Sequence, residues 1–168
     1  RGEAHFQNLI RRRRAAVRLD LAWDLLGEGR HDEARAWISE AQGLAPIARV
    51  TGYAVAGGEP KDLFFAPIQA VRNLMQKSGT AIGDYDLIEA NEAFAVQALA
   101  DGRELGWDWD RVNVHGGAIA LGHPIGASGA RVLATLLHAM RDRGAGTGLA
   151  TLCLGGGNAV ALSVSREV

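Results

Sequence analysis

The chain has 168 residues and a formal net charge of −1, and 48% of its residues are hydrophobic while 22% are charged. This composition is typical of a globular domain with its own core, and it excludes an overall basic surface for nucleic acid. No apolar run reaches the roughly 18 residues that a membrane-spanning helix needs, so we expect a cytoplasmic protein without nucleic-acid or membrane partners.

Residues 1–42 have the periodicity of helices. Apolar residues recur at helical spacing at Val17, Leu21 and Leu25, and the glycines of "GEGR" interrupt the pattern before a second helical segment begins. We therefore predict an α-helical hairpin over 1–42, an appendage to the domain that follows.

From residue 43 onward, strand and helix patterns alternate. The expected strands are 48–57, 85–90, 111–114, 149–154 and 159–165, and the expected helices are 66–78, 91–105 and 128–143. Glycines follow two of these helices, at Gly79 and Gly144. The alternation predicts a layered α/β domain over 43–168 whose last two strands pair as a hairpin.

Three polar residues stand where predicted strands end or turn into helices. Asn91 follows "LIEA", His123 lies in "GHPIGASG", and Cys153 precedes the glycines 155–157. Ligand crevices of α/β sheets form at strand ends, so these side chains are candidates for one pocket. An imidazole base, an amide, a thiol that shuttles a proton and glycine N–H groups together favour acyl transfer.

Each of these residues also has a purely structural interpretation. Asn91 is a candidate helix N-cap, His123 a structural histidine, Cys153 a small core residue, and the glycine triplet a hairpin turn. The residue types by themselves leave these alternatives open.

Three longer segments carry a family resemblance. "NEAFAVQAL" (91–99), "NVHGGAIALGHPIGASGARVL" (113–133) and "LCLGGGNAVAL" (152–162) resemble, in order and spacing, the signature blocks of the thiolase C-terminal domain. The likeness to this acetyl-CoA acetyltransferase family implies a thiolase-type layered fold with a mixed sheet covered by helices. It also implies acyl transfer on coenzyme A thioesters, by thiolysis of 3-ketoacyl-CoA or Claisen condensation of acetyl-CoA, with no metal and no cofactor beyond these substrates.

The resemblance implies a role for each matching residue. Asn91 would hold a water that forms an oxyanion hole together with His123, which also activates the nucleophile. Cys153 would exchange a proton with the substrate, and the N–H of Gly155 would contribute to a second oxyanion hole. Phe94 would lie near the acyl-CoA.

The chain departs from the family in its cysteine count. Thiolases carry the acyl-accepting cysteine in an N-terminal domain and bind coenzyme A with a loop domain, whereas Cys153 is the single cysteine here. We expect the chain to supply the C-terminal half of an active site, with a complementary N-terminal half or further copies of itself as partners. The alternatives are a non-catalytic domain that acts in assembly and a hydrolase that uses Cys153 with His123.

Overall fold

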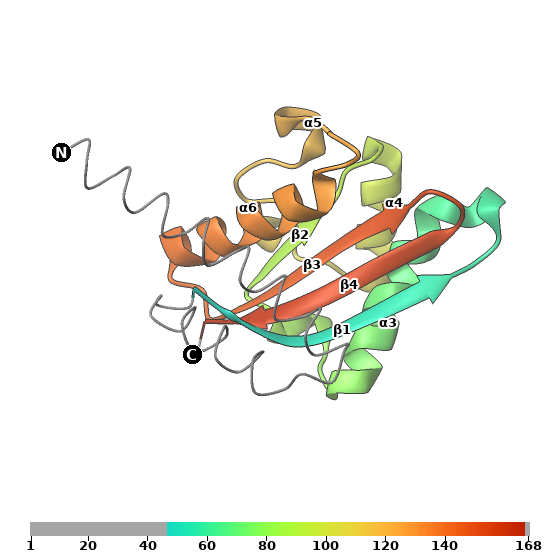
Figure 1. Cartoon of the computed structure of the whole chain (residues 1–168). Helices are drawn as coiled ribbons and strands as arrows, with labels where there is room; N and C mark the ends of the chain where they lie inside the picture. Colours follow the sequence, from blue (N-terminus) through green and yellow to red (C-terminus); the bar gives the residue numbers. More distant parts are fainter. Residues whose placement is uncertain (1–46, 167–168) are drawn as a thin grey trace, which may run out of the picture. The chain divides into compact units, whose positions relative to one another are not determined.

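A computed structural model describes residues 47–166, and the helical hairpin predicted over 1–42 lies outside this range. The described residues contain a four-stranded sheet with the strand order β1-β4-β3-β2 (Figure 1). The strands are β1 (Arg49–Gly57), β2 (Leu87–Ala90), β3 (Thr147–Leu154) and β4 (Asn158–Ser165). Strands β2 and β3 are parallel, and β4 is antiparallel to β3 and to β1. The predicted mixed sheet and the final hairpin are thus confirmed.

The helices account for most of the remaining chain. They are α3 (Ala66–Ser78), α4 (Ala95–Leu105), α5 (Ala118–Leu121) and α6 (Ser128–Arg143), with short 3₁₀ helices at Pro60–Phe65, Ile82–Asp84 and Trp109–Arg111. Helices α3 and α6 end as predicted at Gly79 and Gly144, whose φ angles of 68° and 67° place them in the left-handed region that glycine favours. None of the helices described within 47–166 is long and apolar enough to cross a membrane.

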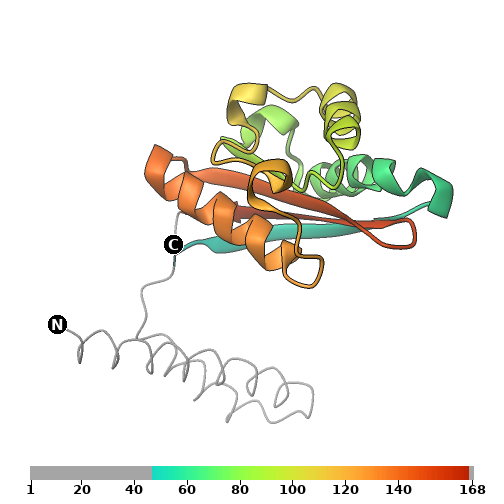
Figure 2. The ribbon, with the colours of Figure 1, turned by 90° about the horizontal axis from the view of Figure 1, so that it is seen from above.

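Helices α3 and α6 cover opposite faces of the sheet (Figure 2). The buried Val71 and Leu74 of α3 pack in one cluster with Leu149 of β3, whereas Leu136 of α6 packs in a second cluster with Ala150. Successive side chains of a strand point to opposite faces, so the neighbours Leu149 and Ala150 supply both layers of the core. Strand β3 is therefore apolar along most of its length, as a strand covered on both faces must be.

Two sequence predictions were wrong in detail. The helix expected over 91–105 begins only at Ala95, because Asn91 still extends the sheet ladder and Phe94 keeps an extended backbone. The strand expected over 111–114 is reduced to a single bridge between Val112 and Ile88. Asn113 has a φ of 48°, a left-handed conformation that a strand does not tolerate, and this ends the extended segment.

The parallel pairing of β2 and β3 positions the candidate site. Ala90 is the register partner of Thr151, and the N–H of Asn91 donates to the carbonyl oxygen of Thr151 over 2.9 Å. The carboxyl ends of the two strands therefore meet at one edge of the sheet, which we call the carboxyl edge. Asn91 and Cys153 both lie at this edge.

Candidate active site

Asn91 lies directly after β2 with its side chain buried, at 1% exposure. Its backbone is tied to β3, and helix α4 begins four residues later with Phe94 at the N-cap position. The interpretation of Asn91 as a helix N-cap is therefore wrong. A buried amide needs partners for its oxygen and its nitrogen, because an unpaired buried polar group is costly.

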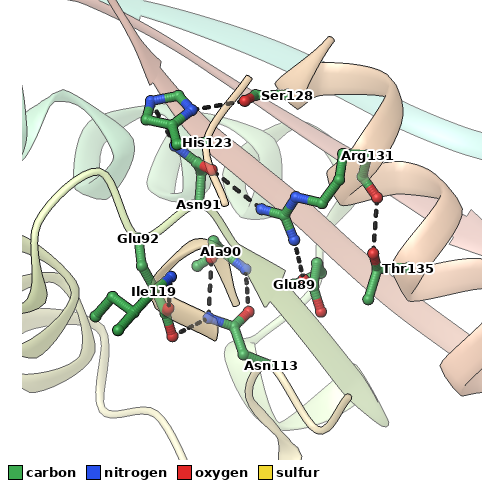
Figure 3. Close-up of polar contacts among 10 residues, drawn as sticks. All are labelled: Glu89, Ala90, Asn91, Glu92, Asn113, Ile119, His123, Ser128, Arg131 and Thr135. Atoms are coloured by element: carbon green, nitrogen blue, oxygen red, sulfur yellow. Dashed lines mark hydrogen bonds and ion pairs between the residues drawn. The ribbon is translucent and has the colours of Figure 1, made fainter. Parts of the chain in front are cut away.

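His123 supplies one of these partners (Figure 3). The Nδ2 of Asn91 lies 3.4 Å from Nε2 of His123, although 32 residues separate them in the sequence. On the other side of the ring, Nδ1 lies 2.6 Å from Oγ of Ser128, and this hydroxyl donates to the carbonyl oxygen of Pro124 over 3.0 Å. The structure thus brings together Asn91 and His123, two of the three side chains that we expected in one pocket, and adds Ser128 behind the imidazole.

Arg131 supplies the partner of the Asn91 oxygen. Its NH2 group donates to Oδ1 of Asn91 over 3.0 Å, and its NH1 group donates to Oε1 of Glu89 over 2.8 Å (Figure 3). Glu89 is 1% exposed in strand β2, and this burial raises its pKa to about 7 against the opposing effect of the Arg131 charge. The result is a buried ion pair directly beside the Asn91 amide.

A second set of contacts holds the loop that carries His123. Glu92 accepts hydrogen bonds of 2.9 Å from Nδ2 of Asn113 and from the backbone N–H of Ile119 at the start of α5. Asn113 also pairs with the backbone N–H and carbonyl oxygen of Ala90. The strand end that carries Asn91 and the loop leading to His123 are thus joined by side chains.

The sequence patterns did not point to four further residues that contact the site, Glu89, Glu92, Asn113 and Arg131. One signal was present, since Glu89 is a charged residue inside the short apolar strand "LIEA". A carboxylate in such a strand requires a buried partner. The identity of that partner is set by how α6 crosses the sheet, which the sequence pattern does not contain.

Cys153 lies at the same edge but on the other face of the sheet. The pleat that turns Leu149 toward α3 also turns Cys153 that way, whereas Asn91 faces Arg131 of α6. Its thiol is half-buried, and burial, followed by the nearby Asp101 charge, raises its pKa. Within the described part of the chain, no hydrogen bond joins Cys153 to Asn91 or His123.

The remaining two predicted site residues flank the carboxyl edge. Gly155 is exposed in the turn between β3 and β4, so the triplet also forms the hairpin turn that the structural alternative predicted. Phe94 is 57% exposed and makes an edge-to-face contact with Phe64 at 5.0 Å between ring centroids. Neither contacts Asn91 or His123 through a hydrogen bond within 47–166.

The arrangement offers several chemical functions at one edge of the sheet. A neutral imidazole accepts a proton, an amide or an imidazolium N–H donates to an oxygen that gains charge, and a protonated thiol gives up a proton. These groups suit reactions in which an enolate or a tetrahedral oxyanion forms and decays.

The chain is similar in sequence to proteins of one family. Residues 44–166 match the family model described as "Thiolase, C-terminal domain". The chain is 60% identical over 124 residues to the acetyl-CoA acetyltransferase of Chromobacterium violaceum, and 56% identical over 126 residues to that of Escherichia coli. These alignments cover 74% and 75% of this chain, and 32% of each relative.

Solved structures give the same result. The Bacillus anthracis acetyl-CoA acetyltransferase superposes with a TM-score of 0.73 at 45% identity, covering 76% of this chain and 32% of that one. Human mitochondrial 3-ketoacyl-CoA thiolase superposes with a TM-score of 0.73 at 41% identity, covering 77% and 33%. The chain thus spans about a third of the length of the relatives it matches. It belongs to the thiolase family, of whose members it carries the C-terminal domain.

Proposed function

We propose that this chain supplies the C-terminal half of an active site that transfers acyl groups between coenzyme A thioesters. The reaction is thiolysis of 3-ketoacyl-CoA or, in reverse, Claisen condensation of acetyl-CoA. The contact between Asn91 and His123 at the carboxyl edge is the observation that supports this proposal most directly. The family resemblance implies a base and an amide donor at these two positions, and the contact between an imidazole and an amide supports that assignment.

Asn91 and His123 act on the thioester oxygen in this proposal. The Cα–H of a thioester is weakly acidic, so its removal needs a base and donors aimed at the enolate oxygen. Asn91 holds a water at this oxygen and His123 donates to it, while the N–H of Gly155 donates to the oxyanion of the acyl-transfer step. Phe94 lines the acyl-CoA site.

Cys153 acts as the proton-exchanging thiol. A raised pKa keeps it protonated at neutral pH, which favours a proton donor over a ready nucleophile. A reactant lying across the carboxyl edge would meet Cys153 from one face of the sheet and His123 from the other. The hydrolase alternative needs Cys153 and His123 as a hydrogen-bonded pair, and no such pair occurs within 47–166.

The partner in this proposal brings the nucleophile. Cys153 is the one cysteine of the 168 residues, so the acyl group is carried by a cysteine of a complementary N-terminal half or of a further polypeptide. A single cysteine cannot pair within these 168 residues, and a free thiol is suited to a reducing compartment, so we propose that the activity is cytoplasmic.

A chimera tests the proposal. Residues 44–166 of this chain replace the matching segment of the Chromobacterium violaceum acetyl-CoA acetyltransferase, which is 60% identical to this chain over 124 residues. We expect a chimera active in thiolysis of acetoacetyl-CoA, and His123→Ala in it to lower kcat by about 10² to 10³. His138→Ala, on the exposed side of α6, is the matched control and should retain activity.

The outcomes separate the alternatives. A folded but inactive chimera would contradict the proposal and favour a non-catalytic domain. The chain by itself should not form a stable acetyl adduct on Cys153 when it is incubated with acetyl-CoA and analysed by mass spectrometry. A stable adduct, or rapid hydrolysis of acetyl-CoA by the chain alone, would favour the hydrolase.

A further inference from the structure

The guanidinium of Arg131 touches the site through groups that only donate hydrogen bonds. It contacts Glu89 on one side and Asn91 on the other, and its side chain is 14% exposed. A guanidinium has five N–H donors and no acceptor, so any atom that bonds to it must be an acceptor. This restriction also sets the direction of hydrogen bonds between residues that Arg131 does not contact.

The direction of each following hydrogen bond is fixed by the one before. Because Arg131 donates, the atom of Asn91 that faces it is the oxygen Oδ1, and the amide nitrogen Nδ2 therefore faces His123. Nδ2 only donates, so Nε2 of His123 must present its lone pair. The ring proton is then on Nδ1, which donates to Ser128, and the Ser128 hydroxyl donates to Pro124.

We propose that Arg131 is a positioning residue that orients the Asn91 amide and thereby holds neutral His123 in the Nδ1–H tautomer, with the Nε2 lone pair at the carboxyl edge. The use of this tautomer in acyl transfer rests on the proposed function. The tautomer itself does not, because it follows from the contacts of the free protein.

The same arrangement has a consequence once His123 has accepted a proton. Its Nε2–H would then face the N–H₂ group of Asn91, and two donors form no hydrogen bond. Asn91 cannot turn its oxygen toward the ring without losing its bond to Arg131. The new Nε2–H is therefore left to donate to a substrate oxygen, which makes one ring atom the base and then the donor of the oxyanion hole.

Glu89 fixes Arg131 in turn. The ion pair spans 2.8 Å and Glu89 is 1% exposed, so rotating the guanidinium away would leave a buried carboxylate unpaired. The hydrogen-bonding capacity of Arg131 is not fully used, because its buried Nε has no partner within 47–166. A purely structural arginine would be expected to have all its buried N–H groups bonded. Its two bonded N–H groups are both directed at the site rather than at the helix that carries it.

Nuclear magnetic resonance of the whole chain tests the proposal without substrate. Two-bond 1H–15N correlation spectra, recorded near pH 8 where a free imidazole is neutral, distinguish Nδ1–H from Nε2–H histidine. The His123 signals are assigned as those lost in His123→Gln among the five histidines. We expect the wild type to show the Nδ1–H tautomer at His123.

Substitutions of Arg131 should weaken the preference of His123 for the Nδ1–H tautomer. Arg131→Lys keeps a charge beside Glu89 but removes the second N–H group that holds Asn91, and Arg131→Met removes both contacts. Loss of one such hydrogen bond should lower the ratio of Nδ1–H to Nε2–H about five-fold or more. Thr135→Val is the matched control. Among residues 47–166, its hydroxyl bonds only to the backbone oxygen of Arg131, so the tautomer should not change.

A reversal variant shows that the spectrum responds to the amide. Asn91→Asp places an acceptor against Nε2 of His123. Nε2 should therefore become protonated, and the spectrum should show the Nε2–H form. The proposal is overturned if folded Arg131→Lys and Arg131→Met both keep the wild-type His123 spectrum while Asn91→Asp changes it. It is also overturned if the wild type shows the Nε2–H tautomer. An inactive chimera with an intact Nδ1–H tautomer would instead contradict the proposed function alone.

Discussion

Oε2 of Glu92, two residues beyond the end of β2, accepts a hydrogen bond of 2.9 Å from the backbone N–H of Ile119 in the first turn of α5. The other oxygen of the same carboxylate accepts from Nδ2 of Asn113, also over 2.9 Å. Glu92 follows Asn91 directly, and α5 leads into the loop that carries His123. This carboxylate therefore links the strand end that carries Asn91 to the segment leading to His123, and we expect the distance between these two residues to depend on it.

Gly117→Ala tests that dependence. A Cβ at Gly117 would lie 2.2 Å from Cδ of Glu92, so the carboxylate would have to leave its position between Asn113 and Ile119. We expect a loss of about 1 to 3 kcal/mol in the free energy of unfolding, measured by urea denaturation, as for other overpacked sites. The His123 resonances should shift as well, because the loop moves relative to β2.

Gly126→Ala is the matched control in the loop that carries His123. Among residues 47–166, an added Cβ at Gly126 meets nothing within 4 Å, and the backbone there is not in the left-handed region. Stability should therefore change by less than about 0.5 kcal/mol. Equal losses in both variants would show that Glu92 does not need the space beside Gly117.

The stability of the protein should depend on both the side-chain hydrogen bonds and the backbone conformation of Asn113. Its amide makes three hydrogen bonds, two to Ala90 and one to Glu92, and its φ is 48°. Asn113→Ala loses the bonds and retains the backbone penalty, whereas Asn113→Gly loses the bonds but relieves the penalty. We expect both to be destabilising, and the alanine variant to be less stable than the glycine variant by about 1 kcal/mol.

The comparison is made by urea denaturation of the two variants and the wild type. An alanine variant as stable as the glycine variant would mean that the left-handed backbone of Asn113 relaxes at no cost. A glycine variant as stable as the wild type would mean that the three side-chain bonds contribute no more than the left-handed backbone of Asn113 costs.

Asp101 in α4 should make the protein less stable as pH rises. It is fully buried, and burial raises its pKa from 3.8 to about 7 against the opposing hydrogen bond that Gln97 donates. Between about pH 4 and pH 7 the unfolded chain loses this proton while the folded protein keeps it, so the free energy of unfolding falls over that range.

Asp101→Asn should abolish this part of the pH dependence. The variant should gain stability relative to the wild type from pH 4 to pH 7, on the order of a few kcal/mol, at about 1.4 kcal/mol per pKa unit. Thermal or urea unfolding across the pH range measures the difference. Asp62→Asn, at an exposed position, serves as the control. A constant difference between Asp101→Asn and the wild type at every pH would contradict the prediction.

The same substitution should make Cys153 more reactive. Its thiol pKa is raised by burial and then by the Asp101 charge, and the thiolate is the form that reacts. Above pH 7, where Asp101 ionises, iodoacetamide should alkylate Cys153 faster in Asp101→Asn than in the wild type. The chain has one cysteine, so Cys153→Ser provides the blank. An alkylation rate that is the same in Asp101→Asn and the wild type would show that the Asp101 charge does not affect the thiol pKa.

The periodicity of the sequence was sufficient for most of the fold. Helices α3 and α6, the strands of the final hairpin and the mixed character of the sheet follow from spacings of 3.6 and 2 residues and from glycines at the helix ends. The errors fell on Asn91–Phe94 and on residues 111–114, where contacts distant in sequence override local preference. The backbone hydrogen bond of Asn91 to Thr151 replaces the predicted helix start. The side chain of Asn113, which pairs with Ala90, replaces the predicted strand.

The sequence by itself determined the family, through three blocks in the correct order, and the positions of Asn91, His123 and Cys153 at strand ends and turns. Only the tertiary structure decided that Asn91 and His123 touch, that Cys153 faces the other side of the sheet, and that Arg131 meets Asn91 across 40 residues of chain. The physical reason is that strand register sets which face a side chain occupies, and helix packing sets what it meets there. Neither is encoded in the local pattern of residues.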